Sequence, residues 1–241
     1  MGEPGVPEMN AYIEEVLKEG ETLGFDGRVV SVGEGEGYAA IAGKKNAKVN
    51  YQVDLIDEIW EDRPVLSEEP AFNLDVKYAG ETVASKLARI REEMKEAGTN
   101  VHVVSTLDDI CWTLNIRGND IDFFPLVLSY GIITMDSFEL YMDERKLDDK
   151  LKAKLAKDGV NLHPYNDIYE DVKKFGSDVV AMIDPGKLNY ALFNNIPENV
   201  KTVKKRNPAI LMKAIKNPVE IENIRKAQIK DSVAHVRFMK W

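Results

Sequence analysis

Residues 106–125 read TLDDICWTLNIRGNDIDFFP and follow a short apolar run, VHVV, at residues 101–104. A run of this length is typical of a buried parallel strand, because both faces of such a strand are covered. Asp108 and Asp109 then stand where the first turn of a helix would place negative charge beside free N–H groups. The order of strand, helix and glycine-containing loop predicts an α/β fold, in which such loops carry functional groups.

The loop that ends this unit contains Asn115, Arg117 and Asp120. In the simpler interpretation, Asn115 and Asp120 cap turns and Arg117 pairs with a carboxylate at the surface. In a functional interpretation Arg117 contacts another domain or a substrate, because its planar guanidinium can hold a carboxylate through two parallel hydrogen bonds. The residues by themselves favour the simpler interpretation.

Outside this stretch, the spacing of apolar residues alternates between the strand period and the helix period. A hairpin is predicted from strands at residues 126–134 and 137–142. The clearest helix is predicted over residues 82–97, and its core-facing stripe is formed by Val83, Leu87, Ile90 and Met94. These alternating elements predict a mixed sheet flanked by helices on both faces.

Several shorter segments have weaker patterns. Strands are predicted over residues 22–31 and 48–53, and the last extended pieces over residues 202–204 and 209–214. The GEGEG stretch at residues 33–37 lacks the Lys-Ser/Thr of a phosphate-binding loop, and its two glutamates would repel phosphate. We therefore predict a plain loop there, leading into a short helix.

Two features concern the organisation of the chain. Residues 64–70 combine two prolines, a serine and two glutamates without periodicity, which is typical of a boundary between domains. Pro218 starts a helix whose apolar spacing continues almost to Trp241, a length of roughly 35 Å at 1.5 Å per residue. We expect this terminal helix to present an apolar face that no other part of the chain covers.

Composition limits the classes of function. The formal net charge is −9 over 241 residues, which argues against nucleic acid or an anionic membrane as the main partner. The single cysteine, Cys111, cannot form an internal disulfide, and no apolar run approaches the ~20 residues that span a bilayer. A cytoplasmic protein is the expectation.

Candidate chemistry is sparse. The three histidines, His102, His163 and His235, are widely separated and are predicted to be structural rather than metal ligands. Cys111 stands near a helix start that would lower its pKa, but its apolar neighbours favour an inert core thiol. The acidic pairs Asp108-Asp109 and Asp148-Asp149 are expected to diverge and to serve in capping and solvation.

Five spaced blocks of sequence resemble one enzyme family when they are read together. They are GEPGVP at residues 2–7, IWEDRP at 59–64, DDICWTLNIRGNDIDFFP at 108–125, LVLSYGII at 126–133 and KAIKNPVEIENIRKAQIKD at 213–231. With these blocks the chain resembles Xaa-Pro aminopeptidase (aminopeptidase P), a member of the creatinase/prolidase superfamily and of peptidase family M24. The resemblance runs from end to end.

The resemblance implies a creatinase N-terminal-like fold, also described as ribonuclease H-like. Residues 1–70 would be the end of a first creatinase-like domain plus a linker, and residues 71–217 a complete second one. Residues 218–241 would be the first helix of a catalytic "pita-bread" domain. The chain is therefore expected to be a middle portion of a longer enzyme.

The same resemblance implies a division of labour. In the family a dinuclear metal site, usually manganese, is held by two aspartates, a histidine and two glutamates of the pita-bread domain, all beyond Trp241. We therefore expect no catalytic residue and no metal or other cofactor in this chain, which alone would be inactive. Its partners would be its own catalytic domain and, in the parent enzyme, short Xaa-Pro peptides; a homodimeric parent is compatible with the resemblance.

By resemblance, Asn115, Arg117 and Asp120 would line the substrate entrance or orient the catalytic domain, with a structural interdomain salt bridge as the alternative. Glu58, Asp62 and Arg63 of the linker would serve in domain docking. Two other readings of the chain stay open at this point. One is a stand-alone, catalytically inactive creatinase-like module that binds peptides or proteins, and the other is a hydrolase that depends on Cys111.

Overall fold

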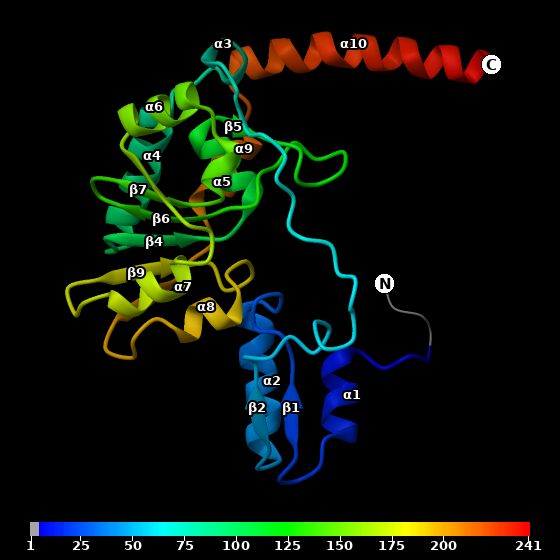
Figure 1. Cartoon of the computed structure of the whole chain (residues 1–241), viewed down its shortest axis with the longest axis vertical. Coiled ribbons are helices and arrows are strands. Elements are labelled where there is room, and N and C mark those ends of the chain that lie inside the picture. Colours follow the sequence, from blue (N-terminus) through cyan, green and yellow to red (C-terminus); the bar gives the residue numbers. More distant parts are fainter. Residues whose placement is uncertain (1–4) are drawn as a thin grey trace.

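The computed structural model describes residues 5–241 and places them in two lobes of unequal size (Figure 1). The larger lobe is built on a six-stranded sheet, and the smaller one on a pair of parallel strands packed against helices. The beginning of the GEPGVP block, residues 2–4, lies outside the described residues.

The large sheet is mixed, as predicted. Its spatial order is β10-β9-β4-β6-β7-β8, and only β6 runs antiparallel to its neighbours. The strands are β4 (Val101–Val104), β6 (Tyr130–Thr134), β7 (Phe138–Tyr141), β8 (Val160–His163), β9 (Val180–Ile183) and β10 (Lys201–Lys204). The predicted hairpin is confirmed as β6 and β7, although its first strand begins at Tyr130 rather than at residue 126.

Helices cover both faces of this sheet because successive strand residues point to opposite sides. In β9, Met182 joins one apolar cluster, whereas Ala181 and Ile183 join the other. The first cluster packs against α4 (Val83–Glu96), α5 (Leu107–Leu114), α6 (Asp149–Lys157) and α9 (Pro208–Ala214). The second packs against α7 (Ile168–Asp171), the short 3-10 helix η2 (Val172–Lys174) and α8 (Tyr190–Asn194).

The small lobe contains α1 (Met9–Val16), β1 (Thr22–Gly24), α2 (Val32–Lys44) and β2 (Lys48–Asn50). The prediction of a loop at residues 33–37 is wrong, because the GEGEG stretch forms the first turns of α2. Ser31 and Glu34 form a reciprocal capping box that starts this helix despite its glycines. Gly35 is needed there, since a Cβ atom would lie 2.3 Å from the ring of Tyr190.

The remaining corrections concern short elements. Residues 209–214 are helical rather than extended, because Asn207 caps α9 and Pro208 occupies its first turn. The strands predicted over residues 22–31 and 48–53 are confirmed only as the three-residue β1 and β2. The sequence patterns missed β3 (Phe72–Asn73), α3 (Val76–Ala79), β5 (Ile116–Arg117) and the 3-10 helix η1 (Glu144–Lys146).

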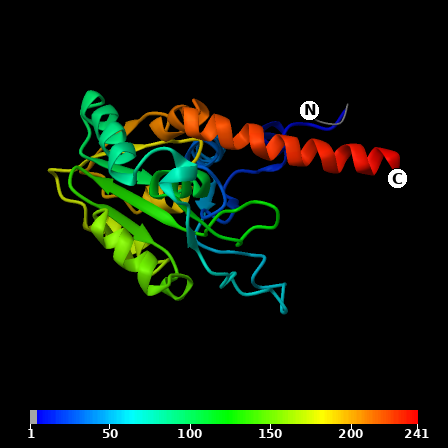
Figure 2. The ribbon, with the colours of Figure 1, turned by 90° about the horizontal axis from the view of Figure 1, so that it is seen from above.

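The last element, α10 (Pro218–Lys240), is the long terminal helix that the sequence predicts. A capping box between Asn217 and Glu220 starts it, and the Asn217 side chain donates to the Ala79 carbonyl of α3. No residue of α10 is buried, and Figure 2 shows the helix running well beyond the large lobe. None of the helices within residues 5–241 is both long and apolar enough to cross a membrane.

Candidate functional site

The three residues singled out from the sequence lie on one short segment, which runs from the end of α5 into the loop at residues 118–126. Asn115 ends α5 with a left-handed backbone (φ 53°), which asparagine tolerates better than most residues. Arg117 lies in β5, opposite Phe72 of β3. Asp120 follows in the loop. The Asp120 N–H donates a hydrogen bond to the Leu126 carbonyl and so closes the base of the loop.

Asn115 is buried and joins two helices. Its Oδ1 accepts a hydrogen bond from Lys86 Nζ at 2.7 Å, and its Nδ2 donates to the Glu81 carbonyl at 2.8 Å. The capping role predicted for Asn115 is confirmed, but the side chain also fixes α5 against α4.

Lys86 is a buried residue that the sequence patterns missed. Its ammonium donates to the Trp112 carbonyl at 2.7 Å and lies 4.4 Å from the centre of the Trp112 ring. Burial lowers the pKa of Lys86 to about 8, and the charges of Glu81 and Glu220 only partly oppose this. A signal was present, because Lys86 comes three residues after Val83 and four before Ile90, a spacing that places it on the apolar face of its helix.

Arg117 is half-buried, and the prediction that it pairs with a surface carboxylate is wrong. Its Nη1 donates to the carbonyls of Cys111 at 2.7 Å and Ile116 at 2.8 Å, and no carboxylate within residues 5–241 forms an ion pair with it. Burial lowers the pKa of the guanidinium. Arg117 therefore completes the carboxyl end of α5, where carbonyl groups lack partners within the helix.

Asp120 does more than cap a turn. Its Oδ2 lies 2.6 Å from Lys146 Nζ, and both side chains are almost fully buried. The same oxygen accepts from the Leu128 N–H at 2.7 Å, while Oδ1 has no hydrogen-bond partner among the described residues. The pair ties the base of the loop to η1. Asn115, Arg117 and Asp120 do not hydrogen-bond with one another, so the structure gives each a separate partner set.

The tip of this loop is apolar and exposed. Phe123 is fully exposed and has a left-handed backbone (φ 64°), which is strained for a bulky residue. Phe124 and Ile121 beside it are also exposed. A rigid base therefore presents an apolar tip to the outside.

Cys111 is the only cysteine and is an inert core thiol, as the sequence favours. It is 1% exposed, and burial raises its pKa to about 11, which is opposite to the shift that a nucleophile needs. The helix start does not lower the pKa, since desolvation is the larger effect.

We expect Cys111 to react slowly with a thiol reagent in the native chain. At pH 8, a thiol with a pKa of about 11 has roughly a hundredfold less thiolate than one near 9, and burial slows access further. Labelling with and without denaturant measures this. Equal rates in both states would contradict the buried position.

The three histidines differ in their surroundings. The buried His102 ring lies 3.1 Å from the Met182 carbonyl and 3.2 Å from Asn207 Oδ1. His163 contacts Glu139 at 2.7 Å, and His235 is exposed on α10. No group of three or more His, Cys, Asp or Glu side chains within residues 5–241 could hold a metal ion. The described residues therefore do not fit a dinuclear metal centre.

The acidic pair Asp108-Asp109 at the start of α5 was expected to diverge and to be solvated, and this prediction is wrong. Asp108 and Asp109 both bind Lys213 of α9, Asp109 at 2.6 Å, and Asp109 is buried rather than solvated. Asp109 also accepts from Asn207 Nδ2 at 2.9 Å. The pair therefore joins α5 to α9. Asp148, by contrast, caps α6 as predicted.

The linker, which we define as residues 51–70, makes local contacts. Arg63 pairs with Asp54 at 2.6 Å and with Asp57 at 2.5 Å, both within the linker itself. Docking by Glu58, Asp62 and Arg63 stays a prediction.

Comparison with known proteins places these features in a family. The model of the creatinase/prolidase N-terminal domain matches residues 62–220. The probable Xaa-Pro aminopeptidase P of Sordaria macrospora is 33% identical over 98% of this chain and 40% of its own length. Xaa-Pro aminopeptidase 1 of Dictyostelium discoideum is 34% identical over 98% of this chain and 39% of its own length.

A solved structure matches the whole chain. The X-prolyl aminopeptidase of Caenorhabditis elegans, described as a cytosolic enzyme with a di-nuclear active site, superposes with a TM-score of 0.93. It is 30% identical and covers 100% of this chain, which corresponds to 40% of that protein. The chain thus spans about 40% of the length of the relatives it matches. With a family model that covers residues 62–220, this chain belongs to the creatinase/prolidase N-terminal domain family.

Proposed function

We propose that this chain is the supporting part of a metal-dependent Xaa-Pro aminopeptidase, an enzyme that removes the N-terminal residue preceding proline. The observation that carries the proposal is the match over the full chain, projecting helix included, to an enzyme two and a half times as long. A dinuclear metal centre, which supplies an activated water in such hydrolases, lies outside the described residues in this proposal. The cytosolic relative supports a cytoplasmic location.

The division of the chain into residues 1–70, 71–217 and 218–241 belongs to this proposal. The family match over residues 62–220 supports the middle unit. The uncovered α10 supports a third unit whose other parts are supplied by the rest of the enzyme.

We propose that the rest of the enzyme contacts one side of this chain. Both overall views place α10, the linker at residues 51–70 and the loop at residues 118–126 on the same side (Figures 1 and 2). Apolar side chains are exposed on all three, for example Trp60, Phe123 and Val236. Apolar side chains that are exposed together on one side of a protein are typical of an interface.

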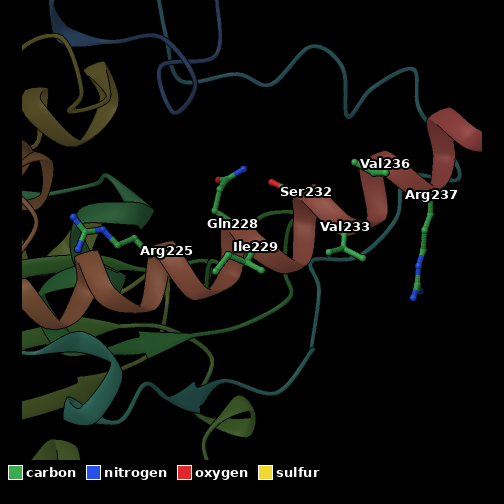
Figure 3. Close-up of a pocket in the computed structure, with 7 residues that line it drawn as sticks. All are labelled: Arg225, Gln228, Ile229, Ser232, Val233, Val236 and Arg237. Atoms are coloured by element: carbon green, nitrogen blue, oxygen red, sulfur yellow. The ribbon is translucent and has the colours of Figure 1, made fainter.

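On α10 the proposed contact is a stripe formed by Ile229, Val233 and Val236. Figure 3 shows Ile229 and Val233 projecting from the same side of the helix, in a shallow groove between Arg225 and Arg237. A helix with an apolar stripe gains most of its stability from packing that stripe against a partner. We propose the catalytic domain as that partner.

Asn115, Arg117 and Asp120 take different parts in the proposal. Asn115 and Asp120 hold the loop at residues 118–126 in place through Lys86 and Lys146. The guanidinium of Arg117 uses only Nη1 in the described contacts, and its other N–H groups can bind a carboxylate of the catalytic domain or of a peptide. These roles shape access to the active site rather than the chemical step.

The first test uses the chain alone. With Mn²⁺ and an Xaa-Pro dipeptide, we expect no turnover above background, because the described residues offer no cage for the metal. Turnover that is abolished by a chelator would contradict the proposal and would favour a complete enzyme in these residues.

The second test uses a chimera in which this chain replaces the matching 40% of the C. elegans enzyme. We expect Val233→Lys to impair Mn²⁺-dependent cleavage by about tenfold or more, since a buried charge in an interface costs over 1.4 kcal/mol. The control is Ala234→Lys, an exposed neighbour that points about 100° away around the helix. Equal effects of both variants would argue against docking through this stripe. In that case α10 would fit a stand-alone binding module better.

A further inference from the structure

The strongest unassigned feature is a cavity at the carboxyl ends of three neighbouring parallel strands. Strands β4, β9 and β10 run in the same direction, and the residues that follow each of them line one cavity of about 480 Å³. Thr106 comes after β4, Asp184 after β9, and Arg206 after β10. In open α/β sheets this edge is where small ligands bind, and the volume lies in the range of ligand pockets.

The charge of this cavity is opposite to that of the chain. Its lining contains five cationic side chains and three carboxylates, whereas the whole chain carries a formal charge of −9. The cations are Lys187, Lys204, Lys205, Arg206 and Lys213. A positive cavity in an acidic protein attracts small anions.

The carboxylates of the cavity are already engaged by the protein. Asp108 and Asp109 share Lys213, and Asp109 accepts further hydrogen bonds from Thr106 and Asn207. Asp184 accepts from the N–H groups of Gly186 at 3.1 Å and of Asn207 at 2.9 Å. Their lone pairs therefore point to internal donors, and the cavity keeps an excess of cations.

Two of the cations have no ion-pair partner within residues 5–241, namely Lys187 and Arg206. The backbone holds both in place. The Lys187 carbonyl accepts from Ser105 Oγ at 2.9 Å, and Arg206 lies between Lys205, whose N–H bonds to the Ile183 carbonyl, and the buried Asn207. Because the backbone is already fixed, less conformational entropy is lost when a ligand binds.

Lys213 is held by Asp108 and Asp109, and the remaining two cations can be recruited by a ligand. Lys204 pairs with Glu36, and Lys205 pairs with Glu93 at 3.0 Å, and neither glutamate lines the cavity. These pairs are partly exposed, and surface pairs of this kind contribute little to stability. An anion in the cavity can therefore take over their ammonium groups at small cost.

We propose that this cavity binds a small oxyanion carrying at least two negative charges, held chiefly by Lys187 and Arg206. Arg206 offers a planar fork to phosphoryl or carboxylate oxygens, and Lys187 provides a compact charge. The site is separate from the loop at residues 118–126, because none of Asn115, Arg117 and Asp120 lines it.

The test is isothermal titration of this chain with inorganic pyrophosphate and, separately, with citrate, at low salt. We expect saturable binding of one or both in the micromolar to millimolar range. Binding of pyrophosphate alone assigns the site to phosphoryl groups, and equal binding of citrate assigns it to multiply charged oxyanions in general. Absence of binding by either at millimolar concentrations overturns the proposal.

Paired variants distinguish specific binding in the cavity from non-specific electrostatic attraction. The double variant Lys187→Gln/Arg206→Gln is expected to weaken binding by at least about tenfold, since charge-assisted contacts are lost. The matched control, Lys150→Gln/Lys157→Gln, removes two exposed lysines of α6 that form no ion pair in the described chain. An equal loss in the control would show diffuse electrostatic attraction and would also overturn the proposal. Circular dichroism checks that both double variants are folded.

Discussion

Replacing Asp120 by alanine is expected to lower the free energy of unfolding by about 3–5 kcal/mol. The Asp120–Lys146 pair is almost completely buried, with 2.6 Å between Oδ2 and Nζ. The variant leaves the Lys146 ammonium without its carboxylate in the interior, and it also removes the acceptor of the Leu128 N–H. Urea unfolding followed by circular dichroism measures the change.

Two further variants make the Asp120 result specific. Asp122→Ala removes an exposed carboxylate from the same loop, and we expect its effect to stay within about 0.5 kcal/mol. Asp120→Leu/Lys146→Met replaces the pair with apolar groups and is expected to recover most of the lost stability, because the unpaired buried charge is gone. If Asp120→Ala costs no more than Asp122→Ala, the buried pair is not what holds the loop.

The second large effect is a dependence of stability on pH that comes from Lys86. Its folded-state pKa is about 8, below the ordinary value of 10.5, because the side chain is buried between α4 and α5. Between these two values the unfolded chain holds the proton that the folded chain has released. The free energy of unfolding therefore rises with pH across this window, at about 1.4 kcal/mol per pH unit.

The measurement compares wild type with Lys86→Met, which keeps a long apolar stem but cannot titrate. We expect the difference in unfolding free energy, wild type minus variant, to grow by roughly 3 kcal/mol from pH 8 to pH 10.5. Taking the difference removes the contribution of the buried tyrosines, such as Tyr130, whose raised pKa lowers stability at high pH. The control is Lys95→Met on the exposed side of α4. The same difference is measured for Lys95→Met. If the Lys86→Met difference changes with pH no more than the Lys95→Met difference, the pKa of Lys86 is not lowered by folding.

Both effects act close to the start of the same loop. Lys86 binds Asn115, which ends α5 before β5, and Lys146 binds Asp120 near the start of the loop. The exposed Phe123 is thereby presented on a base that two buried ammonium groups hold in place. If the loop contacts a catalytic domain, as we propose, the Asp120→Ala variant should also weaken that contact in the chimera.

Local patterns were sufficient for the regular parts of the fold. The VHVV run at residues 101–104 predicted a buried strand, and the stripe that contains Leu87 predicted α4, because burial follows the period of each element. Pro218 predicted the start of α10, and the resemblance over several blocks predicted the family. The signals for the strand and the two helices are local, whereas the family resemblance depends on blocks spread along the whole chain.

Only the tertiary structure decided which polar groups meet. Lys213 is more than a hundred residues from Asp108 and Asp109, and no local pattern indicates that they bind one another. No local pattern indicates the pair of Lys146 with Asp120 either, nor the cations gathered at the ends of β4, β9 and β10. The sequence by itself determined the longer elements, such as β4, α4 and α10, and the apolar faces of the buried ones, since these depend on periods of two and 3.6 residues. The packing of those faces then determined which charges became buried and which found a partner, because a charge withdrawn from water persists only beside groups that compensate it.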